Sequence, residues 1–473
     1  MNLDFITEPE LEFAGGARHI DIRFGLMNYG PLDRGLPGAP TQVRVGIVGD
    51  SESVQGFAQW IETCRSGVTA KASKQPNLFP RFPGYGTAGQ LSTDIITDTG
   101  LQRTLREKDL RILESEKNDN EVVSRTAMLF LEELSAIAEK RKADVLVCAI
   151  PFSLLKRMWT IEGEAIDESP LDLHDLLKAQ AMRLGVPLQL VLPSTYDASK
   201  RLRQVRRDAL RKPQDEATRA WNMYAALYYK AGGVPWRLVR EAAQLTVCYV
   251  GVSFFETLDG SALFTSTAQV FNERGEGIIL RGGAATVSKD DRQPHLDLDG
   301  AQQLLTAAIK TYRGEHKTQP ARVVLCKTSS FSADELAGFR AALDGLDIEA
   351  ADLVNVGDAH TRLFRVGDYP PLRGTLFMKD AEHAVLYTRG SVEFYETYPG
   401  MYIPRPLAIT FAAVASSKRL LAQELLALTK LNWNNTQFDN SEPIMVTAAR
   451  KVGHILRYVP PSEMPQNSYS FYM

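Results

Sequence analysis

The first half of the chain alternates short unbroken apolar runs with segments in which apolar residues recur at helical spacing. The apolar runs predict buried strands at 43–49, 143–151 and 188–193. The helical spacing predicts helices at 122–142, about 171–184 and 215–230. This alternation is typical of a parallel sheet covered by helices. The first 40 residues are rich in Gly and Pro, which predicts an irregular lead-in. The stop signal "AGGVPW" after the last helix places a domain boundary near Arg240.

The second half begins with consecutive strands, predicted at 245–256, 261–272 and 277–281. A helix at 299–313, a strand at 321–330 and a helix at 332–343 follow. Further strands run to about residue 388, and helices at 416–430 and 444–458 close the chain. Three strands followed by alternation is the order expected of an RNase H-like fold. We therefore expect an α/β protein, with a Rossmann-like domain over 1–240 and an RNase H-like domain over 241–473.

The strands of the second half lack the acidic residues of a two-metal nuclease. Such an enzyme needs carboxylates on adjacent strands to hold two cations about 4 Å apart. The strand "LTVCYVGVSFFET" offers Gly251, Val252 and Ser253 instead, and "ARVVLCKTSS" offers Lys327 and Thr328. Because a hydroxyl is a poor ligand for a hard divalent cation, we expect a nucleic-acid binder that keeps the fold without the chemistry.

Composition narrows the class of protein. A chain of 473 residues with 44% hydrophobic and 23% charged residues is typical of an ordinary globular protein. Its cysteines, Cys64, Cys148, Cys248 and Cys326, form no CxxC pair, which indicates neither disulfides nor zinc and suits the cytoplasm. The N-terminus does not have the pattern of a signal peptide. No apolar stretch is long enough to predict a membrane span.

The net charge of −3 argues weakly against nucleic-acid binding, but the charge is unevenly distributed. The run "KRLRQVRRDALRK", residues 200–212, carries seven basic residues and one acid, Asp208. Such a run can follow a phosphate backbone. A solvated helix face has the same composition, so both interpretations stay open.

One set of residues has the chemistry of a phosphate pocket. His174 and Lys178 lie four apart on one helix face. Gln189 starts the next predicted strand, and Lys230 ends a later helix. Ammonium groups neutralise phosphate charge, and an imidazole can stack on a base. A half-exposed helix face would show the same spacing, so the pattern alone does not decide.

Several long motifs point to a known family. They are "WNMYAALYYKAGGVPW", "GVSFFET", "VVLCKTSSF", "LYTRGSVEFYETYPGMYIPRPL", "LTKLNWNNTQFDNSEPI" and "AARKVGHI". Through them the chain resembles a short prokaryotic Argonaute, which consists of a MID domain and a PIWI domain. The resemblance covers nearly the whole chain. It implies a lead-in plus MID domain over 1–240 and a PIWI domain over 241–473.

The resemblance also implies a site for a guide strand. In this family the MID pocket binds the guide 5′-phosphate, here through His174, Lys178, Gln189 and Lys230. Many prokaryotic members hold a divalent cation, expected here to be Mg²⁺, in the same pocket. Its protein ligands would be Gln189 and the C-terminal carboxylate of Met473, and the cation would remove the repulsion between carboxylate and phosphate. The apolar ending "SYSFYM" suits a segment that turns inward.

The resemblance further implies an inactive nuclease. The positions of the acidic tetrad carry Ser253, about Thr328, and near the end Arg450. The loop glutamate has no clear counterpart, although Glu273 and Glu276 are nearby. Three of four positions therefore fail, and we expect no cleavage of a target strand.

Other basic residues are candidates for the nucleic-acid channel, with a plain surface cation as the alternative for each. They are Arg405, Arg450, Lys451 and Arg457.

Short Argonautes act with a second protein, and the resemblance implies the same here. That protein carries an APAZ domain fused to an effector, often a sirtuin-like or TIR-type NADase. The pair forms a heterodimer that loads a small guide RNA and recognises complementary single-stranded DNA of an invading phage or plasmid. Recognition activates the effector, and NAD depletion leads to abortive infection. The present chain would be the cytoplasmic sensor, with catalysis in its partner.

Two alternatives differ in class. One is a guide-directed endonuclease that uses non-standard carboxylates, such as Glu256, Asp259 and Asp358. The other is a scaffold that does not bind nucleic acid and has no need of His174 or Lys178.

Overall fold

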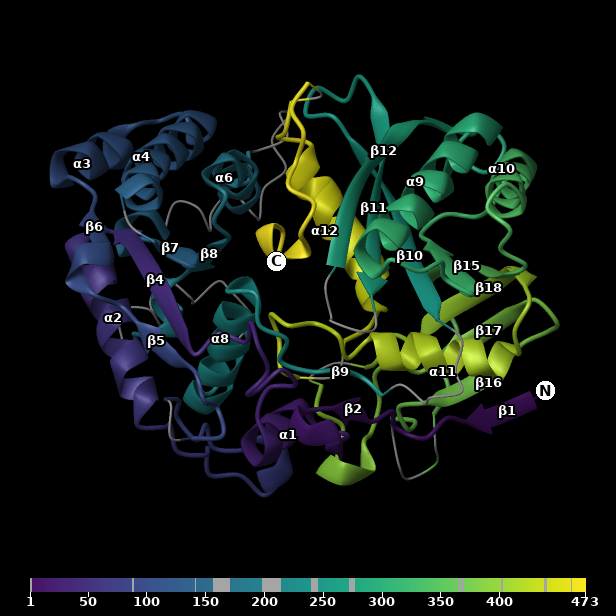
Figure 1. Cartoon of the computed structure of the whole chain (residues 1–473), viewed down its shortest axis with the longest axis horizontal. Coiled ribbons are helices and arrows are strands. Elements are labelled where there is room, and N and C mark those ends of the chain that lie inside the picture. Colours follow the sequence, from purple (N-terminus) through teal and green to yellow (C-terminus); the bar gives the residue numbers. More distant parts are fainter. Residues whose placement is uncertain are drawn as a thin grey trace.

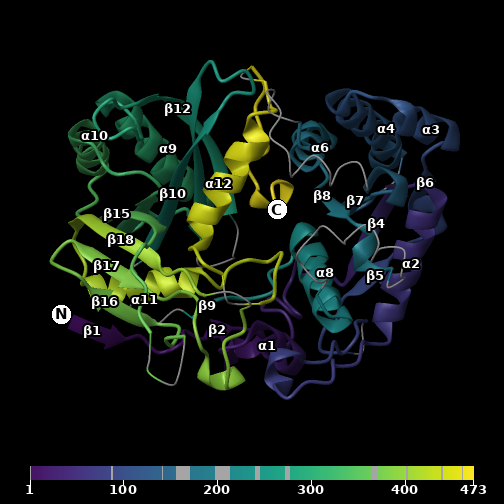
Figure 2. The same ribbon diagram turned by 180° about the vertical axis from the view of Figure 1, so that it is seen from behind.

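The computed structural model describes residues 2–86, 89–140, 142–155, 171–197, 214–239, 246–271, 277–364, 366, 370–400, 403–437, 440–460 and 462–473. The basic run 200–212, the expected boundary at Arg240, and Glu273 and Glu276 lie outside these residues. The described part forms a five-stranded sheet, a ten-stranded sheet and a small three-stranded sheet (Figures 1 and 2).

The first sheet is parallel, as the alternating pattern predicts. Its strands are β4 (Gln42–Gly49), β5 (Asp94–Ile96), β6 (Gln102–Thr104), β7 (Val145–Ala149) and β8 (Leu188–Val191). Strand β4 lies between β7 and the two short strands β5 and β6, and β8 forms the other edge. Its helices are α2 (Ser51–Arg65), α3 (Glu107–Ser115), α4 (Asp119–Lys140), α6 (Leu173–Ala181) and α8 (Glu216–Lys230).

Alternation along the strands explains why helices cover both faces of this sheet. Val145 and Val147 of β7 pack into one apolar core, which includes residues of α2 and α8. Leu146 and Cys148 of the same strand pack into a second core, with residues of α3, α4 and α6. Successive side chains of a strand point to opposite faces, so an unbroken apolar run must be covered twice.

The second sheet has ten strands in the order β1-β16-β17-β18-β15-β14-β10-β11-β12-β13. Strands β10 (Val247–Glu256), β11 (Leu263–Phe271) and β12 (Gly277–Val287) are antiparallel neighbours. Strands β14 (Arg322–Lys327) and β15 (Ala350–Asp358) continue parallel to β10. This is the predicted RNase H-like arrangement. The remaining strands are β1 (Asn2–Phe5), β13 (Pro294–His295), β16 (Thr375–Met378), β17 (His383–Leu386) and β18 (Leu407–Val414).

Two pairs of helices cover this sheet. Helices α9 (Leu298–His316) and α10 (Ala333–Asp344) share an apolar core with Val250 and Val252 of β10. Helices α11 (Lys418–Leu428) and α12 (Ile444–Leu456) pack with Tyr249 on the opposite face. Helix α12 lies so close to β10 that a Cβ on Gly251 would come within 2.1 Å of the main-chain oxygen of Met445.

The lead-in is more regular than its Gly and Pro content predicts. Strand β1 pairs with β16 at the edge of the large sheet. Strand β2 (Leu11–Glu12) lies between β3 (Arg18–His19) and β9 (Arg237–Leu238), and helix α1 (Ile22–Tyr29) follows. Between β1 and β2, the Glu8 carboxylate accepts from Arg373 Nε at 2.9 Å and from Lys430 Nζ at 3.0 Å. Tertiary partners, not local propensity, order this segment.

No helix in the described ranges is both long and apolar enough to cross a lipid bilayer.

Candidate functional site

Lys178 is a buried cation on α6. Asp172 caps this helix, because its carboxylate accepts from the main-chain N–H of Asp175 at 2.9 Å. Lys178 follows six residues later and is only 2% exposed. Its Nζ donates to the main-chain oxygen of Leu188 at 2.9 Å and also to that of Met473. The ammonium group therefore joins the start of β8 to the C-terminal segment.

Lys230 is a second buried cation, at the end of α8. Its side chain is 3% exposed, and its Nζ donates to Gln189 Oε1 at 2.7 Å. The Gln189 amide in turn donates through Nε2 to the main-chain oxygen of Leu190 at 2.9 Å. Two hydrogen bonds thus fix the amide of Gln189 on β8, with its oxygen toward Lys230.

A third cation, Lys451 of α12, lowers the pKa of the first two through its positive charge. Burial lowers the pKa of Lys178 to about 7, and the positive charge of Lys451 contributes to that shift. Burial also lowers the pKa of Lys230 well below its usual value, and the charges of Lys178 and Lys451 lower it further. Desolvation lowers the pKa of Lys451 as well, although its side chain is exposed to solvent. Like charges at close range in a poorly solvated place repel strongly, so this cluster favours binding of an anion.

The C-terminal segment lies against this cluster. A short helix at Tyr469–Phe471 contacts α8 and β12, and Tyr472 and Met473 are buried after it. Figures 1 and 2 both show the C-terminus between α8 and α12. The apolar ending thus turns inward as its sequence predicts. It brings the main-chain oxygen of Met473 to Lys178.

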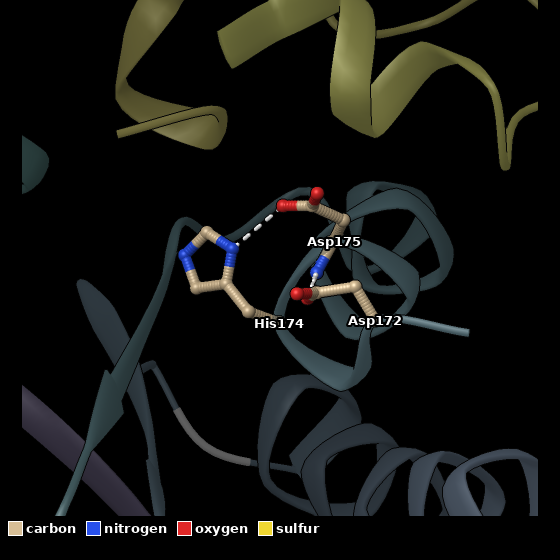
Figure 3. Close-up of side chains that lie close together, drawn as sticks. All are labelled: Asp172, His174 and Asp175. Carbon is tan, nitrogen blue, oxygen red and sulfur yellow. Dashed lines mark hydrogen bonds and ion pairs between the residues drawn. The ribbon is translucent and has the colours of Figure 1, made fainter. Parts of the chain in front are cut away.

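His174 lies one turn before Lys178 on α6 and is half exposed. Its Nδ1 is 2.7 Å from Asp175 Oδ1, and Figure 3 shows the ring turned toward this carboxylate, with Asp172 beside it. The ligand atoms of Asp172, His174 and Asp175 lie within 4.8 Å of one another. The structure therefore places His174 beside two acids that the sequence interpretation passed over. Their signal was the capping position of Asp172 and the position of Asp175 three residues later.

The structure brings four of the predicted phosphate-pocket residues to one place, and His174 lies one helical turn away from them. Lys178 with Met473, and Lys230 with Gln189, form two hydrogen-bonded pairs that meet on neighbouring residues of β8, Leu188 and Gln189. Lys451, expected along a channel, belongs electrostatically to the same group. The sequence could not indicate this, because α12 follows α6 by more than 260 residues.

The donor atoms suit a hard cation in type. Gln189 Oε1 and the oxygen of Met473 are the kinds of oxygen ligand that Mg²⁺ accepts. In this structure both already accept hydrogen bonds from lysine ammonium groups. Two protein oxygens are few for an octahedral ion, so phosphate oxygens and water would have to supply the remaining ligands.

The nuclease-like positions meet at the carboxyl ends of two adjacent strands. Val252 of β10 pairs with Lys327 of β14 in parallel register, and Thr328 N donates to the main-chain oxygen of Val252 at 3.2 Å. Ser253 and Thr328 therefore lie next to each other, and Ser253 is 4% exposed. Neither side chain provides a carboxylate for a metal ion.

Lys327 points to the opposite face of the sheet, toward α10. It is fully buried, and its Nζ lies 2.5 Å from both carboxylate oxygens of Glu335. The Nζ also donates to the main-chain oxygen of Ser330 at 2.7 Å. Glu335 is part of a capping box with Ser332 at the start of α10. This ion pair fixes the loop after β14 and lies apart from the Ser253 face.

Two of the other three channel candidates, Arg405 and Arg450, are paired with acidic side chains. Arg405 Nη1 lies 2.5 Å from Asp358 Oδ2, and both side chains are exposed. Arg450 Nη1 donates to Glu442 Oε2 at 2.9 Å. Arg457 follows α12, and its Nε is buried without a hydrogen-bond partner among the described residues. The structure thus gives these three arginines different surroundings and joins none of them to the lysine cluster.

No model of a known protein family matches this chain, and neither does any curated protein. Solved structures do match it. Clostridium butyricum Argonaute bound to a guide DNA and a 19-mer target DNA superposes with a TM-score of 0.65 at 14% identity, over 98% of this chain and 53% of that one. Drosophila Piwi gives 0.59 at 10% identity, over 99% and 56%. A. aeolicus Argonaute gives 0.56 at 12% identity, over 98% and 54%.

The chain spans about half the length of these proteins, and nearly all of it is matched. At such low sequence identity the likeness establishes the fold. Together with the two sheets and their order of strands, it shows that this chain has the mixed α/β fold of the MID and PIWI regions of Argonaute and Piwi proteins.

Proposed function

We propose that this chain binds the 5′-phosphate of a short guide strand at the lysine cluster and uses the guide to recognise a complementary strand. The observation that carries this proposal is the convergence of Lys178, Lys230 and Lys451 from three separate helices. The fold supports it, since the similar Clostridium butyricum protein was solved with a guide DNA and a target DNA.

The cluster suits a terminal phosphate for a physical reason. Buried like charges cost free energy in the empty protein. A phosphate dianion offers three acceptor oxygens and removes this repulsion when it binds. Gln189 adds a fixed amide beside Lys230. The half-exposed ring of His174 on the same helix is available to stack on the first base of the guide.

We further propose that Mg²⁺ takes part in this pocket. Gln189 Oε1 and the oxygen of Met473 would be its protein ligands, with the remaining ligands from guide phosphates and water. The cation would supply positive charge between phosphate and carboxylate. Lys230 and Lys178, which now donate to those two oxygens, would turn to the phosphate.

The guide would direct recognition without cleavage. Ser253 and Thr328 provide hydroxyls where a two-metal site needs carboxylates. The alternative endonuclease finds little support in the carboxylates proposed for it. Asp358 is paired with Arg405, and the carboxylate of Asp259 already accepts hydrogen bonds from Thr257 and Ser261. We therefore propose a sensor rather than a nuclease.

The sensor would act through a partner. On this proposal a small guide RNA and a single-stranded DNA target form a duplex on the chain, and that duplex activates an APAZ-fused effector, such as a sirtuin-like or TIR-type NADase, in antiphage or antiplasmid defence. Activation requires that the duplex favour a conformation or assembly that the guide alone does not. An assay of NAD consumption by the reconstituted pair, with and without target, tests this step.

The pocket itself is tested by RNA binding. The affinity for a short RNA is measured with a 5′-phosphate and with a 5′-hydroxyl, each in Mg²⁺ and in EDTA. We expect at least about a tenfold preference for the phosphate, equal to about 1.4 kcal/mol, and a smaller preference in EDTA. Lys178→Met and Lys230→Met should remove it, whereas the exposed Lys310→Met should not. Equal binding of both RNAs by the wild-type chain would refute the pocket.

A further inference from the structure

We infer that Arg281 of β12 is a positioning residue for the phosphate pocket: its guanidinium holds the end of α12, the helix that carries Lys451, to the strand that also holds the segment ending at Met473. This inference rests on the proposed function and concerns a residue that does not itself touch the phosphate. Four features of the structure carry it.

The first feature is the set of hydrogen bonds that Arg281 makes. Its guanidinium donates through Nη2 to the main-chain oxygens of Leu456 at 3.0 Å and Val459 at 2.7 Å, and through Nη1 to that of Pro460 at 3.0 Å. The last carbonyls of a helix have no partner within the helix and carry its negative dipole end. The Arg281 guanidinium gives the carbonyl of Leu456, the last residue of α12, a donor besides Val459 N, and it places a positive charge at this end of the helix.

The second feature is what α12 carries. Lys451 lies on this helix, five residues before Leu456, and its charge acts on Lys178 and Lys230. Just after the helix, the hydroxyl of Tyr458 accepts from the main-chain N–H of Asp172 at 2.9 Å. Asp172 caps α6, the helix of Lys178. The end of α12 that Arg281 holds is therefore the end that meets the pocket helix.

The third feature is the second segment held by the same strand. Ile278 of β12 forms an isolated bridge with Ser468, and Ile279 N donates to the main-chain oxygen of Asn467 at 2.7 Å. The short helix that follows ends at Met473, whose oxygen accepts from Lys178. One strand thus aligns both contributions of the C-terminal half to the pocket.

The fourth feature is the chemistry of the side chain. Three carbonyl oxygens in different directions need several donors in a fixed plane, which a guanidinium has and a lysine ammonium lacks. A lysine at this position keeps the charge but reaches fewer carbonyls. Arg281→Met removes both the charge and the donors, so its three hydrogen bonds to the end of α12 and the residues after it are lost. The position of Lys451 then becomes less fixed.

The experiment compares Arg281→Met, Arg281→Lys and the exposed control Arg313→Met with the wild-type chain. For each, the thermal midpoint and the affinities for 5′-phosphorylated and 5′-hydroxyl RNA are measured. We expect Arg281→Met to lower the phosphate preference about tenfold at little change in 5′-hydroxyl binding. Arg281→Lys should be intermediate, and Arg313→Met unchanged. A merely structural role would lower both affinities together and leave their ratio intact.

The outcomes separate the two proposals. A wild-type chain without phosphate preference refutes the proposed function and this inference with it. A wild-type preference that a folded Arg281→Met retains overturns this inference alone. Should Arg281→Met not fold, Arg281→Lys decides, because it keeps the charge but reaches fewer of the three carbonyls. We expect it to reduce the preference about threefold, and an unchanged preference overturns the inference.

Discussion

At the scale of single residues, the chain buries the amino groups of Lys178 and Lys230 at a cost in free energy. Lys178 and Lys230 are almost fully buried and are linked to uncharged oxygens or to the terminal residue, not to acidic side chains. Desolvation and mutual repulsion both disfavour their charged forms. Such a cost is typical of binding sites, which are rarely optimised for stability.

This cost predicts a pH dependence of guide binding. In the free protein the pKa of Lys178 is lowered to about 7, whereas a bound phosphate dianion raises it. Between pH 7 and 9 the free Lys178 increasingly loses its proton, so binding takes a proton up and the phosphate preference falls as pH rises. The phosphate is already fully ionised in this range, since its second pKa is about 6. Calorimetry in buffers of different ionisation enthalpy should show proton uptake at pH 8.

The lowered pKa of Lys178 also makes the stability of the free protein depend on pH. A lysine whose pKa is lower folded than unfolded destabilises the fold when protonated, so its contribution to stability improves as pH rises from about 7. The free energy of unfolding of the wild-type chain should therefore rise relative to that of Lys178→Met between pH 7 and 9. Parallel pH profiles in urea unfolding would contradict the lowered pKa.

The buried Lys327–Glu335 pair predicts a loss of stability when one of its two charges is removed. Glu335→Gln leaves the ammonium of Lys327 buried without its carboxylate, which typically costs about 3–5 kcal/mol. The double variant Lys327→Met with Glu335→Leu removes both charges and should recover much of the loss. Urea unfolding measures both, with the exposed Glu315→Gln as control. A Glu335→Gln variant as stable as that control would show that the pair is not a stabilising contact.

At the scale of elements, the sequence predicted those whose apolar period is long and regular. The unbroken apolar run of β7 and the helical spacing of α4 and α9 each specify an element locally. Strand β1 could not be predicted, because its four residues become a strand only by pairing with β16. The same limit applied to the site. Lys178 and Gln189 were proposed from neighbouring elements and the family resemblance, whereas the effect of Lys451 on Lys178 and the contacts of Arg281 with the end of α12 depend on tertiary structure that no local pattern encodes.

Glu8 shows how the lead-in is held. Its burial raises the pKa of the carboxyl, but the charges of Arg373 and Lys430 outweigh this and hold the pKa below its usual value. Glu8→Gln should leave two buried cations without their carboxylate and lower the free energy of unfolding by about 3 kcal/mol or more. The exposed Glu10→Gln, two residues away, should change it by less than about 0.5 kcal/mol. Equal thermal midpoints for the two variants would contradict this role.

At the scale of the whole molecule, the lysine cluster lies where the two halves meet. Helices α6 and α8 come from the first half, and α12 and the C-terminal segment come from the second (Figure 1). A guide phosphate bound there would contact both halves at once. This arrangement suits a sensor, because it joins guide binding to the relative placement of the two sheets.

The sensor account predicts binding without cutting. With a complementary target, the guide-loaded chain should hold the DNA in Mg²⁺ or Mn²⁺ and leave it intact, because the Ser253 and Thr328 positions provide no carboxylate. Denaturing gels of an end-labelled target measure this. A single guide-directed product that requires the metal would contradict the account and favour the alternative, a guide-directed endonuclease.

The most direct test of the central claim is the affinity of the purified chain for one short RNA with either a 5′-phosphate or a 5′-hydroxyl, compared with Lys178→Met and Lys310→Met. The account predicts that the wild-type chain and Lys310→Met prefer the phosphate by about tenfold or more and that Lys178→Met does not. Equal affinity of the wild-type chain for the two RNAs would contradict it.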